Sequence, residues 1–143
     1  MLLVSQNVKS HYNFKLPDDV VLRINLAWCN SLDELEKKLS DEKNYKFFLD
    51  LPQGRIKPPN NKYSLDEMIP ILESNPQIRY FAVSNVEGKK DLEPFLEKLP
   101  KDIIIVPKIE SPNAVDNIKE IFESLRNNKK IIMLDHDDLF SSI

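Results

Sequence analysis

Short apolar runs alternate with stretches of helical periodicity along this chain. Five runs of seven to nine residues are rich in Ile, Val, Leu and Phe and do not alternate with polar residues. Such runs are typical of strands that are buried on both faces of a parallel sheet. They lie at 20–28, 45–51, 78–84, 102–109 and 129–135. The opening residues "MLLVSQ" predict a further strand at the start of the chain.

The segments between these runs have the spacing of amphipathic helices. Ser31 with Glu34, and Ser64 with Glu67, each form the pattern of a capping box at a helix start. The predicted helices cover 31–40, 64–75, 88–99 and 113–128. A regular alternation of strands and helices predicts an α/β protein with a parallel sheet.

The number of βα units limits the architectures that the chain can form. Five or six βα steps at intervals of about 25 residues fit either a TIM-barrel-like (β/α) fold or an open doubly wound sheet. A complete barrel takes about 250 residues, so a chain of 143 residues would lack two or three units. We therefore predict an incomplete barrel of five or six units, with residues 1–143 forming one domain that is a fragment or a minimal form of the barrel.

Composition removes several classes of function. The 20 basic and 23 acidic residues give a net charge of −3 and are interspersed, so no basic stripe predicts nucleic-acid binding. The only two glycines, Gly54 and Gly88, are too few for a phosphate-binding loop of the P-loop or dinucleotide type.

No apolar run approaches the roughly 20 residues of a membrane span, and the start lacks a signal-peptide pattern, so we expect a cytoplasmic protein. Cys29 is the single cysteine, and we expect a buried structural thiol.

Polar residues gather where the predicted strands end. In parallel α/β folds this is where function concentrates, because the following loops vary while the sheet fixes their positions. The residues at these ends are Arg23, Asn25, Asp50, Ser84, Asn85, Lys108, Glu110 and the run Asp135 to Asp138.

Lys108 and Glu110 are two positions apart on one strand, so their side chains point to the same side of the sheet. Glu110 and Asp138 from the next strand's end would offer two carboxylates to Mg²⁺ or Mn²⁺. A lysine beside such a site can have a lowered pKa and exchange protons with carbon. The alternative is a structural ion pair at a strand end. His136 is either a metal ligand or base, or a solvated or structural histidine.

The order of four motifs resembles the barrel of pyruvate kinase. "IIIVPKIESPNAVDNIKEI" followed by "IIMLDHDDL" is similar to that family's Lys-Ile-Glu strand, its next helix and its following strand with an Asp-Leu pair. "LRINLAW", "FFLDLPQGRIK" and "YFAVSNVEGKKDLEPF" resemble three earlier strands in the same order. The resemblance covers roughly residues 20 to 140.

This resemblance implies a function and roles for four residues. Glu110 and Asp138 correspond to ligands of Mg²⁺ or Mn²⁺, and Asp138 also lies beside the substrate. Lys108 corresponds to the group near the enolate carbon of a phosphoenolpyruvate- or pyruvate-like oxoacid. Arg23 corresponds to a contact for the phosphoryl group. The implied activity is that of a phosphotransferase or a related lyase.

The resemblance is partial at other positions. Asn25 and Asp50 match two potassium ligands of the family, but Ala27 and Leu51 replace the Ser and Thr that complete that site. Lys57 takes the place of a family arginine. We therefore expect K⁺ binding to be impaired here.

Three further departures leave alternatives open. Asp137 replaces a glycine whose backbone approaches the substrate carboxylate, and neither the nucleotide-covering domain nor the last two barrel strands and regulatory domain are present. Two interpretations therefore stay open: a metal-dependent enzyme, or a catalytically degenerate barrel that binds a partner or forms oligomers. Citrate lyase β-chains and HpcH-type aldolases resemble the same pattern and need no ATP. An incomplete barrel has two open sheet edges, so we expect a homo-oligomer or a larger parent chain.

Overall fold

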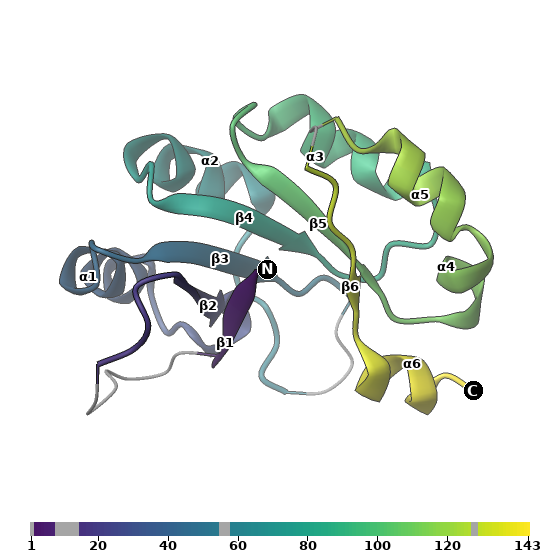
Figure 1. Ribbon diagram of the computed structural model, residues 1–143, viewed down its shortest axis with the longest axis horizontal. Helices are drawn as coiled ribbons and strands as arrows, with labels where there is room; N and C mark the ends of the chain where they lie inside the picture. Colours follow the sequence, from purple (N-terminus) through teal and green to yellow (C-terminus); the bar gives the residue numbers. More distant parts are fainter. Residues whose placement is uncertain (1, 8–14, 55–57, 127–128) are drawn as a thin grey trace.

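The sheet is parallel throughout and curled. The computed structural model describes residues 2–7, 15–54, 58–126 and 129–143 (Figure 1). Within them, six strands pair in chain order from β1 to β6 and form a half-barrel, as expected of an incomplete parallel β/α barrel. The strands are β1 (Leu3–Asn7), β2 (Val20–Asn25), β3 (Lys46–Leu51), β4 (Ile78–Val83), β5 (Ile104–Ile109) and β6 (Met133–Leu134). The predicted α/β class and parallel sheet are confirmed.

Helices follow every strand from β2 onward. The α-helices between the strands lie over one face of the sheet, whereas α6 lies beside the end of β6 (Figure 1). The helices are α1 (Leu32–Asp41), α2 (Leu65–Ser74), α3 (Glu93–Lys98), α4 (Pro112–Asp116), α5 (Ile118–Ser124) and α6 (His136–Ser141). Two 3₁₀-helices cover Leu26–Trp28 and Lys89–Leu92. None of the helices in the described ranges is both long and apolar enough to cross a membrane.

Both faces of the sheet are buried, which explains why the strands are apolar without alternation. Residues such as Leu22 and Leu49 join the larger core under the helices, whereas Val21 and Phe48 join a smaller cluster on the other face. On that second, concave face the side chains change from apolar to polar towards the carboxyl end of the sheet. In β5, Val106 belongs to the apolar cluster, and the next residues with the same orientation are Lys108 and Glu110.

The capping box predicted at the start of α2 is complete, whereas the one predicted at the start of α1 forms only one of its two hydrogen bonds. Ser64 and Glu67 form the complete capping box of α2. Ser31 accepts a hydrogen bond from the backbone of Glu34 at the start of α1, as predicted. The Glu34 carboxylate, however, accepts from the backbone N–H of Asn30 instead of that of Ser31, so the reciprocal half is absent.

Three elements before β6 differ clearly from the predicted ranges. The strand predicted at 20–28 ends at Asn25, because that side chain accepts from the N–H of Ala27 and begins a 3₁₀-helix. The helix predicted at 113–128 is divided into α4 and α5 at Asn117, whose amide donates to the Glu87 carbonyl at 2.8 Å. The helix predicted at 88–99 begins as a 3₁₀-helix, and α3 follows with Pro94 in its first turn.

The last strand is much shorter than the predicted range of 129–135. Within the described segment 129–143, only Met133 and Leu134 pair with β5. Lys130 instead donates to the carbonyls of Phe122 and Glu123 at 3.2 Å each, which ties the segment before β6 to the end of α5.

Candidate metal centre at the carboxyl ends of the strands

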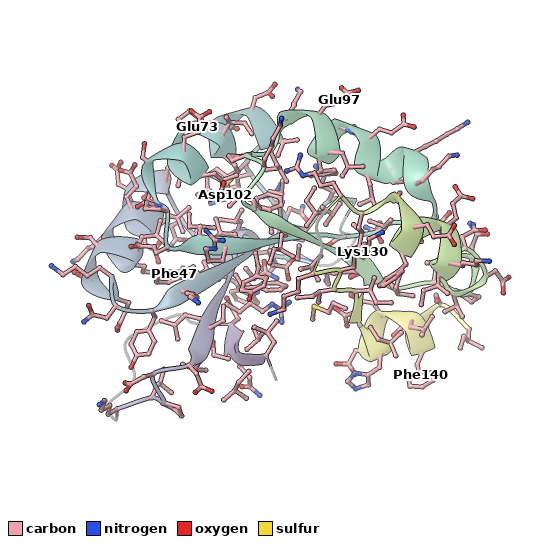
Figure 2. All side chains as sticks on the ribbon, turned by 45° about the horizontal axis from the view of Figure 1, so that its top comes forward. Phe47, Glu73, Glu97, Asp102, Lys130 and Phe140 are labelled. Atoms are coloured by element: carbon pink, nitrogen blue, oxygen red, sulfur yellow. The ribbon has the colours of Figure 1, made fainter. Side chains whose placement is uncertain are left out.

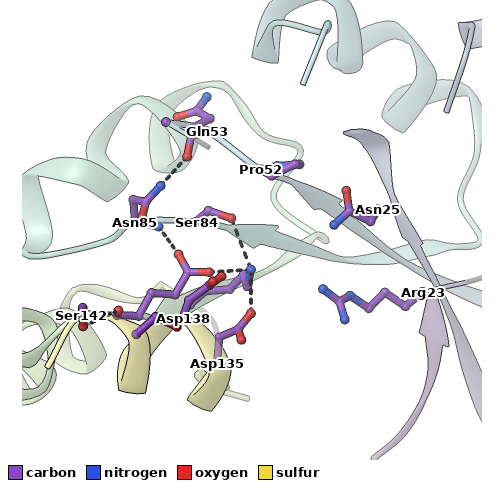
Figure 3. A pocket seen from close by; sticks show the side chains of 13 residues that line it. Arg23, Asn25, Pro52, Gln53, Ser84, Asn85, Asp135, Asp138 and Ser142 are labelled. Carbon is purple, nitrogen blue, oxygen red and sulfur yellow. Dashed lines mark hydrogen bonds and ion pairs between the residues drawn. The ribbon is translucent and has the colours of Figure 1, made fainter. Parts of the chain in front are cut away.

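A pocket of about 600 Å³ opens at the carboxyl ends of the strands. Strand ends and the loops after them line it, together with α6. Arg23 and Asn25 lie on one side, and Asp135 and Asp138 lie on the other (Figure 3). Lys108 and Glu110 also line it, so every residue predicted at the divalent-metal and substrate site reaches the same cavity.

Three carboxylates converge in this pocket. One oxygen of each of Glu110, Asp135 and Asp138 lies within 4.8 Å of the other two, close enough to hold a metal ion. Glu110 is buried, Asp135 is partly buried and Asp138 is exposed, so the cluster runs from the protein interior to solvent. The set consists of hard oxygen donors, which suit Mg²⁺ or Mn²⁺ and leave coordination positions for water or a ligand.

The end of the sheet produces this convergence. Glu110 follows directly after β5, and the backbone N–H of Asp135 donates to the Ile109 carbonyl at 3.1 Å, which places Asp135 next to that strand end. Helix α6 begins immediately after Asp135, and its first turn carries Asp138. A strand end and a helix start from consecutive units therefore meet at one point.

Glu110 is held by contacts at both carboxylate oxygens and at its backbone. The backbone N–H of Asn85 donates to Oε2 at 2.6 Å, and the Lys108 ammonium lies 2.6 Å from Oε1. The Ser142 hydroxyl donates to the Glu110 carbonyl at 3.3 Å. Only 7% of Glu110 is exposed, so these contacts fix its orientation within the pocket.

The loop after β4 presents the Asn85 N–H through an uncommon backbone conformation. Asn85 has φ 55°, in the left-handed region that asparagine tolerates better than most residues. Its side-chain amide donates to the Gln53 carbonyl, and Figure 3 shows this link between the loops after β3 and β4. Gly54, beside Gln53, also has a positive φ of 64°.

Lys108 lies at the centre of the acidic groups. Its ammonium is 2.6 Å from Glu110, 3.0 Å from Asp135 and 3.9 Å from Asp50, with the Ser84 hydroxyl at 3.5 Å. Burial alone would lower the pKa of Lys108. The charge of Asp50 and the hydrogen bond and charge of Glu110, with a contribution from Asp135, outweigh burial and raise this pKa above its ordinary value. The expectation of a lowered lysine pKa is therefore wrong, because more carboxylates surround Lys108 than the sequence indicated.

Arg23 and the two predicted potassium ligands have protein partners. The Arg23 guanidinium lies 2.5 Å from Oδ2 of Asp50, which is completely buried. The Asn25 side-chain oxygen accepts from the N–H of Ala27. The described contacts thus use an oxygen of each predicted potassium ligand, and K⁺ binding there stays a prediction. Lys57 lies outside the described residues.

In the run Asp135 to Asp138, His136 and Asp137 do not contribute to the pocket. His136 Nε2 lies 3.1 Å from Asp137, and both side chains are largely exposed. Neither lines the pocket. Cys29 is buried as predicted, and burial, the largest cause, raises the pKa of its thiol.

Two contributors to the site were not assigned roles from the sequence. Asp135 was one of several acids in a row, and only the start of α6 decides which of them turn into the pocket. Asn85 acts through its backbone N–H, and the sequence carries no signal for that beyond the tolerance of asparagine for positive φ.

Comparison with known proteins adds no family assignment. The chain matches no family model, and no curated protein matches it significantly. The resemblance to pyruvate kinase is therefore carried by its motifs alone and stays a prediction.

Proposed function

We propose that this protein is a metal-dependent enzyme of the pyruvate kinase-like TIM-barrel superfamily that acts on a phosphoenolpyruvate- or pyruvate-like oxoacid through an enolate. The observation that carries the proposal is the convergence of Glu110, Asp135 and Asp138 within 4.8 Å, beside a buried lysine, at the carboxyl ends of parallel strands. Active sites of β/α barrels lie at this end of the sheet. The collinear motifs point to the same class of chemistry.

The three carboxylates would hold Mg²⁺ or Mn²⁺ in this site. A bound divalent ion supplies electrophilic stabilisation of negative charge on a substrate oxygen. Arg23, on the opposite side of the pocket, offers a positive charge to an anionic group of the substrate. The negative charge of Asp50, with which Arg23 is paired, partly offsets this attraction. A pocket of about 600 Å³ is within the range of small-molecule sites.

Lys108 acts in this proposal as a cation and proton donor. Its raised pKa keeps the ammonium charged at neutral pH, so it stabilises an adjacent enolate and delivers a proton to carbon. A neutral lysine that removes a proton would need the opposite shift. The proposed direction is therefore enolate protonation, with the carboxylate of Asp50, which is not one of the three proposed metal ligands, maintaining the charge on Lys108.

Calorimetric titration of the protein with Mn²⁺ tests the metal site. Glu110→Gln keeps the shape of the side chain and removes one ligand charge, so Mn²⁺ affinity should fall by at least about tenfold. Glu73→Gln is the matched control, because Glu73 is exposed on α2 in the helix layer (Figure 2). Equal affinities for the wild type and Glu110→Gln would refute the proposed site.

Two alternatives to a phosphotransferase are retained. A lyase of the HpcH or citrate lyase β-chain type would use the same carboxylates and would cleave an oxoacid or acyl substrate with Mg²⁺ and no ATP. ATP-independent release of pyruvate would favour it. A degenerate barrel that serves binding or oligomerisation is favoured by the exposed apolar side chains at the two edge elements, Leu3 on β1 and Leu134 on β6.

A further inference from the structure

The ammonium of Lys108 occupies the place where two of the three candidate metal ligands converge. Its Nζ lies 2.6 Å from Oε1 of Glu110 and 3.0 Å from Oδ2 of Asp135. The lysine side chain is 6% exposed, so these contacts are made with little water present. A divalent cation that uses the same carboxylates must compete with this ammonium for them.

The charges of the pocket show why a cation is needed there. Among the described residues that line it, Arg23 and Lys108 are cationic, and Glu110, Asp135 and Asp138 are anionic. Asp50, adjacent to both cations, adds a fourth negative charge and brings the net charge of the group to −2. Without Lys108, close carboxylates would repel one another in a partly buried site.

Asp50 is a further carboxylate close to the ammonium of Lys108. Asp50 is completely buried, and its Oδ1 atom has no hydrogen-bond partner among the residues that the structure describes. Its Oδ2 atom lies 3.9 Å from Lys108 Nζ, beyond a normal hydrogen bond, and is bound by Arg23. A buried carboxylate oxygen without a partner is costly, so the arrival of an ammonium would stabilise it.

We infer that Lys108 is an exchangeable counter-ion, which neutralises Glu110 and Asp135 when no metal is bound and moves to Asp50 when a divalent cation enters. This inference rests on the proposed metal site and defines how its affinity is set. The lysine weakens metal binding by competition, and Asp50 restores part of the affinity by accepting the displaced ammonium.

Mn²⁺ titrations of four proteins test the exchange: wild type, Lys108→Met, Asp50→Asn and the double variant. Lys108→Met removes the competing charge and should tighten Mn²⁺ binding by about tenfold or more. Asp50→Asn should weaken binding in the wild-type background, because the ammonium loses its second location. The same Asp50→Asn change should alter affinity less than about twofold in the Lys108→Met background.

The double variant distinguishes movement of the Lys108 ammonium to Asp50 from a direct effect of the Asp50 charge on the metal ion. If Asp50 acted only through its negative charge, Asp50→Asn would weaken Mn²⁺ binding equally in both backgrounds, and the inference would be overturned. Unchanged or weaker binding by Lys108→Met would also overturn it. Lys108→Gln, a neutral polar variant, serves if Lys108→Met does not fold, and the expected gain is the same.

Failure of the metal site and failure of the exchange give different results. If Glu110→Gln leaves wild-type Mn²⁺ affinity unchanged, the proposed site is wrong. If Glu110→Gln weakens binding but Lys108→Met does not strengthen it, the site stands and only the exchange is wrong.

Discussion

Asn85 illustrates how one backbone conformation supports a candidate ligand. Its positive φ directs the N–H to Oε2 of Glu110, while its amide holds the loop that contains Gln53. Glycine adopts positive φ without strain, whereas alanine pays about 1 kcal/mol or more for it. The two substitutions therefore separate the role of the backbone from that of the side chain.

We expect Asn85→Gly to keep Mn²⁺ affinity within about twofold of the wild type, because the N–H still points at Glu110. Asn85→Ala should weaken Mn²⁺ binding by about fivefold, since relief of its backbone strain turns the N–H away. Calorimetry measures both. Equal affinities for the two variants would show that the conformation of residue 85 does not position Glu110.

For single residues, the sequence predicted the direction in which a side chain points better than it predicted the residues that the side chain contacts. Period-two geometry was enough to place Lys108 and Glu110 on one side of β5, and strand ends brought Asp138 close to them. The pKa of Lys108 could not be predicted, because it depends on Asp50 and Asp135 from other elements. Distances between elements are not encoded in any local pattern.

The start of α2 is the clearest case in which an element follows from local chemistry. Ser64 and Glu67 exchange hydrogen bonds, and the N–H of Ser64 and then its hydroxyl lower the pKa of the Glu67 carboxyl. A lowered carboxyl pKa means that the folded state favours the charged form. This contribution to the free energy of unfolding is present above the pKa of a free glutamate, about 4.3, and is lost as the pH falls through the lower folded value.

Glu67→Gln should therefore reduce the free energy of unfolding more at pH 7 than at pH 3. Urea denaturation at the two pH values measures the difference between wild type and variant. Glu73→Gln on the same helix is the control, and its difference should change less with pH. A destabilisation by Glu67→Gln that is equal at both pH values would contradict the role of the charged carboxylate.

Elements were predicted well where local signals act and less well where tertiary contacts decide. Strands β2 to β5 begin within two residues of the predicted ranges. The break between α4 and α5 could not be predicted, because it accompanies a bond from Asn117 to the distant Glu87 carbonyl. The shortness of β6 likewise accompanies contacts of Lys130 with the end of α5.

At the scale of the whole molecule, the half-barrel leaves two edge strands. Outer strands β1 and β6 each pair on one side within the described residues, and Leu3 and Leu134 on them are 43% and 60% exposed. Phe140 on the neighbouring α6 is 69% exposed. Unpaired edges with apolar side chains favour association with another chain.

We expect the 16.7 kDa chain to form a dimer or a larger assembly at micromolar concentration. Size-exclusion chromatography with light scattering measures the mass. Leu134→Lys places a charge on the exposed edge and should shift the assembly towards the monomer, whereas the control Glu97→Gln in the helix layer should not. A wild-type monomer over the whole concentration range would contradict edge pairing.

Fold class was predictable because it depends on repetition, which a single sequence displays. The half-barrel agrees with the incomplete barrel predicted from the number of βα units. The curvature of the sheet could not be predicted, because it is the sum of many small twists and packing contacts. The chain's family also could not be settled by its motifs, since four short matches in order carry only an expectation of function, and neither a family model nor a curated protein matches the chain.

In the proposed function, Glu110, Asp135 and Asp138 together hold a divalent cation in the strand-end pocket. A crystal soaked with Mn²⁺ and oxalate, an enolate mimic, tests it through anomalous diffraction at the manganese absorption edge. We expect one dominant anomalous peak between the three carboxylates, with oxalate completing the coordination of the manganese ion. Anomalous density only at exposed surface carboxylates, or no density in this pocket at saturating Mn²⁺, would show that these carboxylates do not form the metal site.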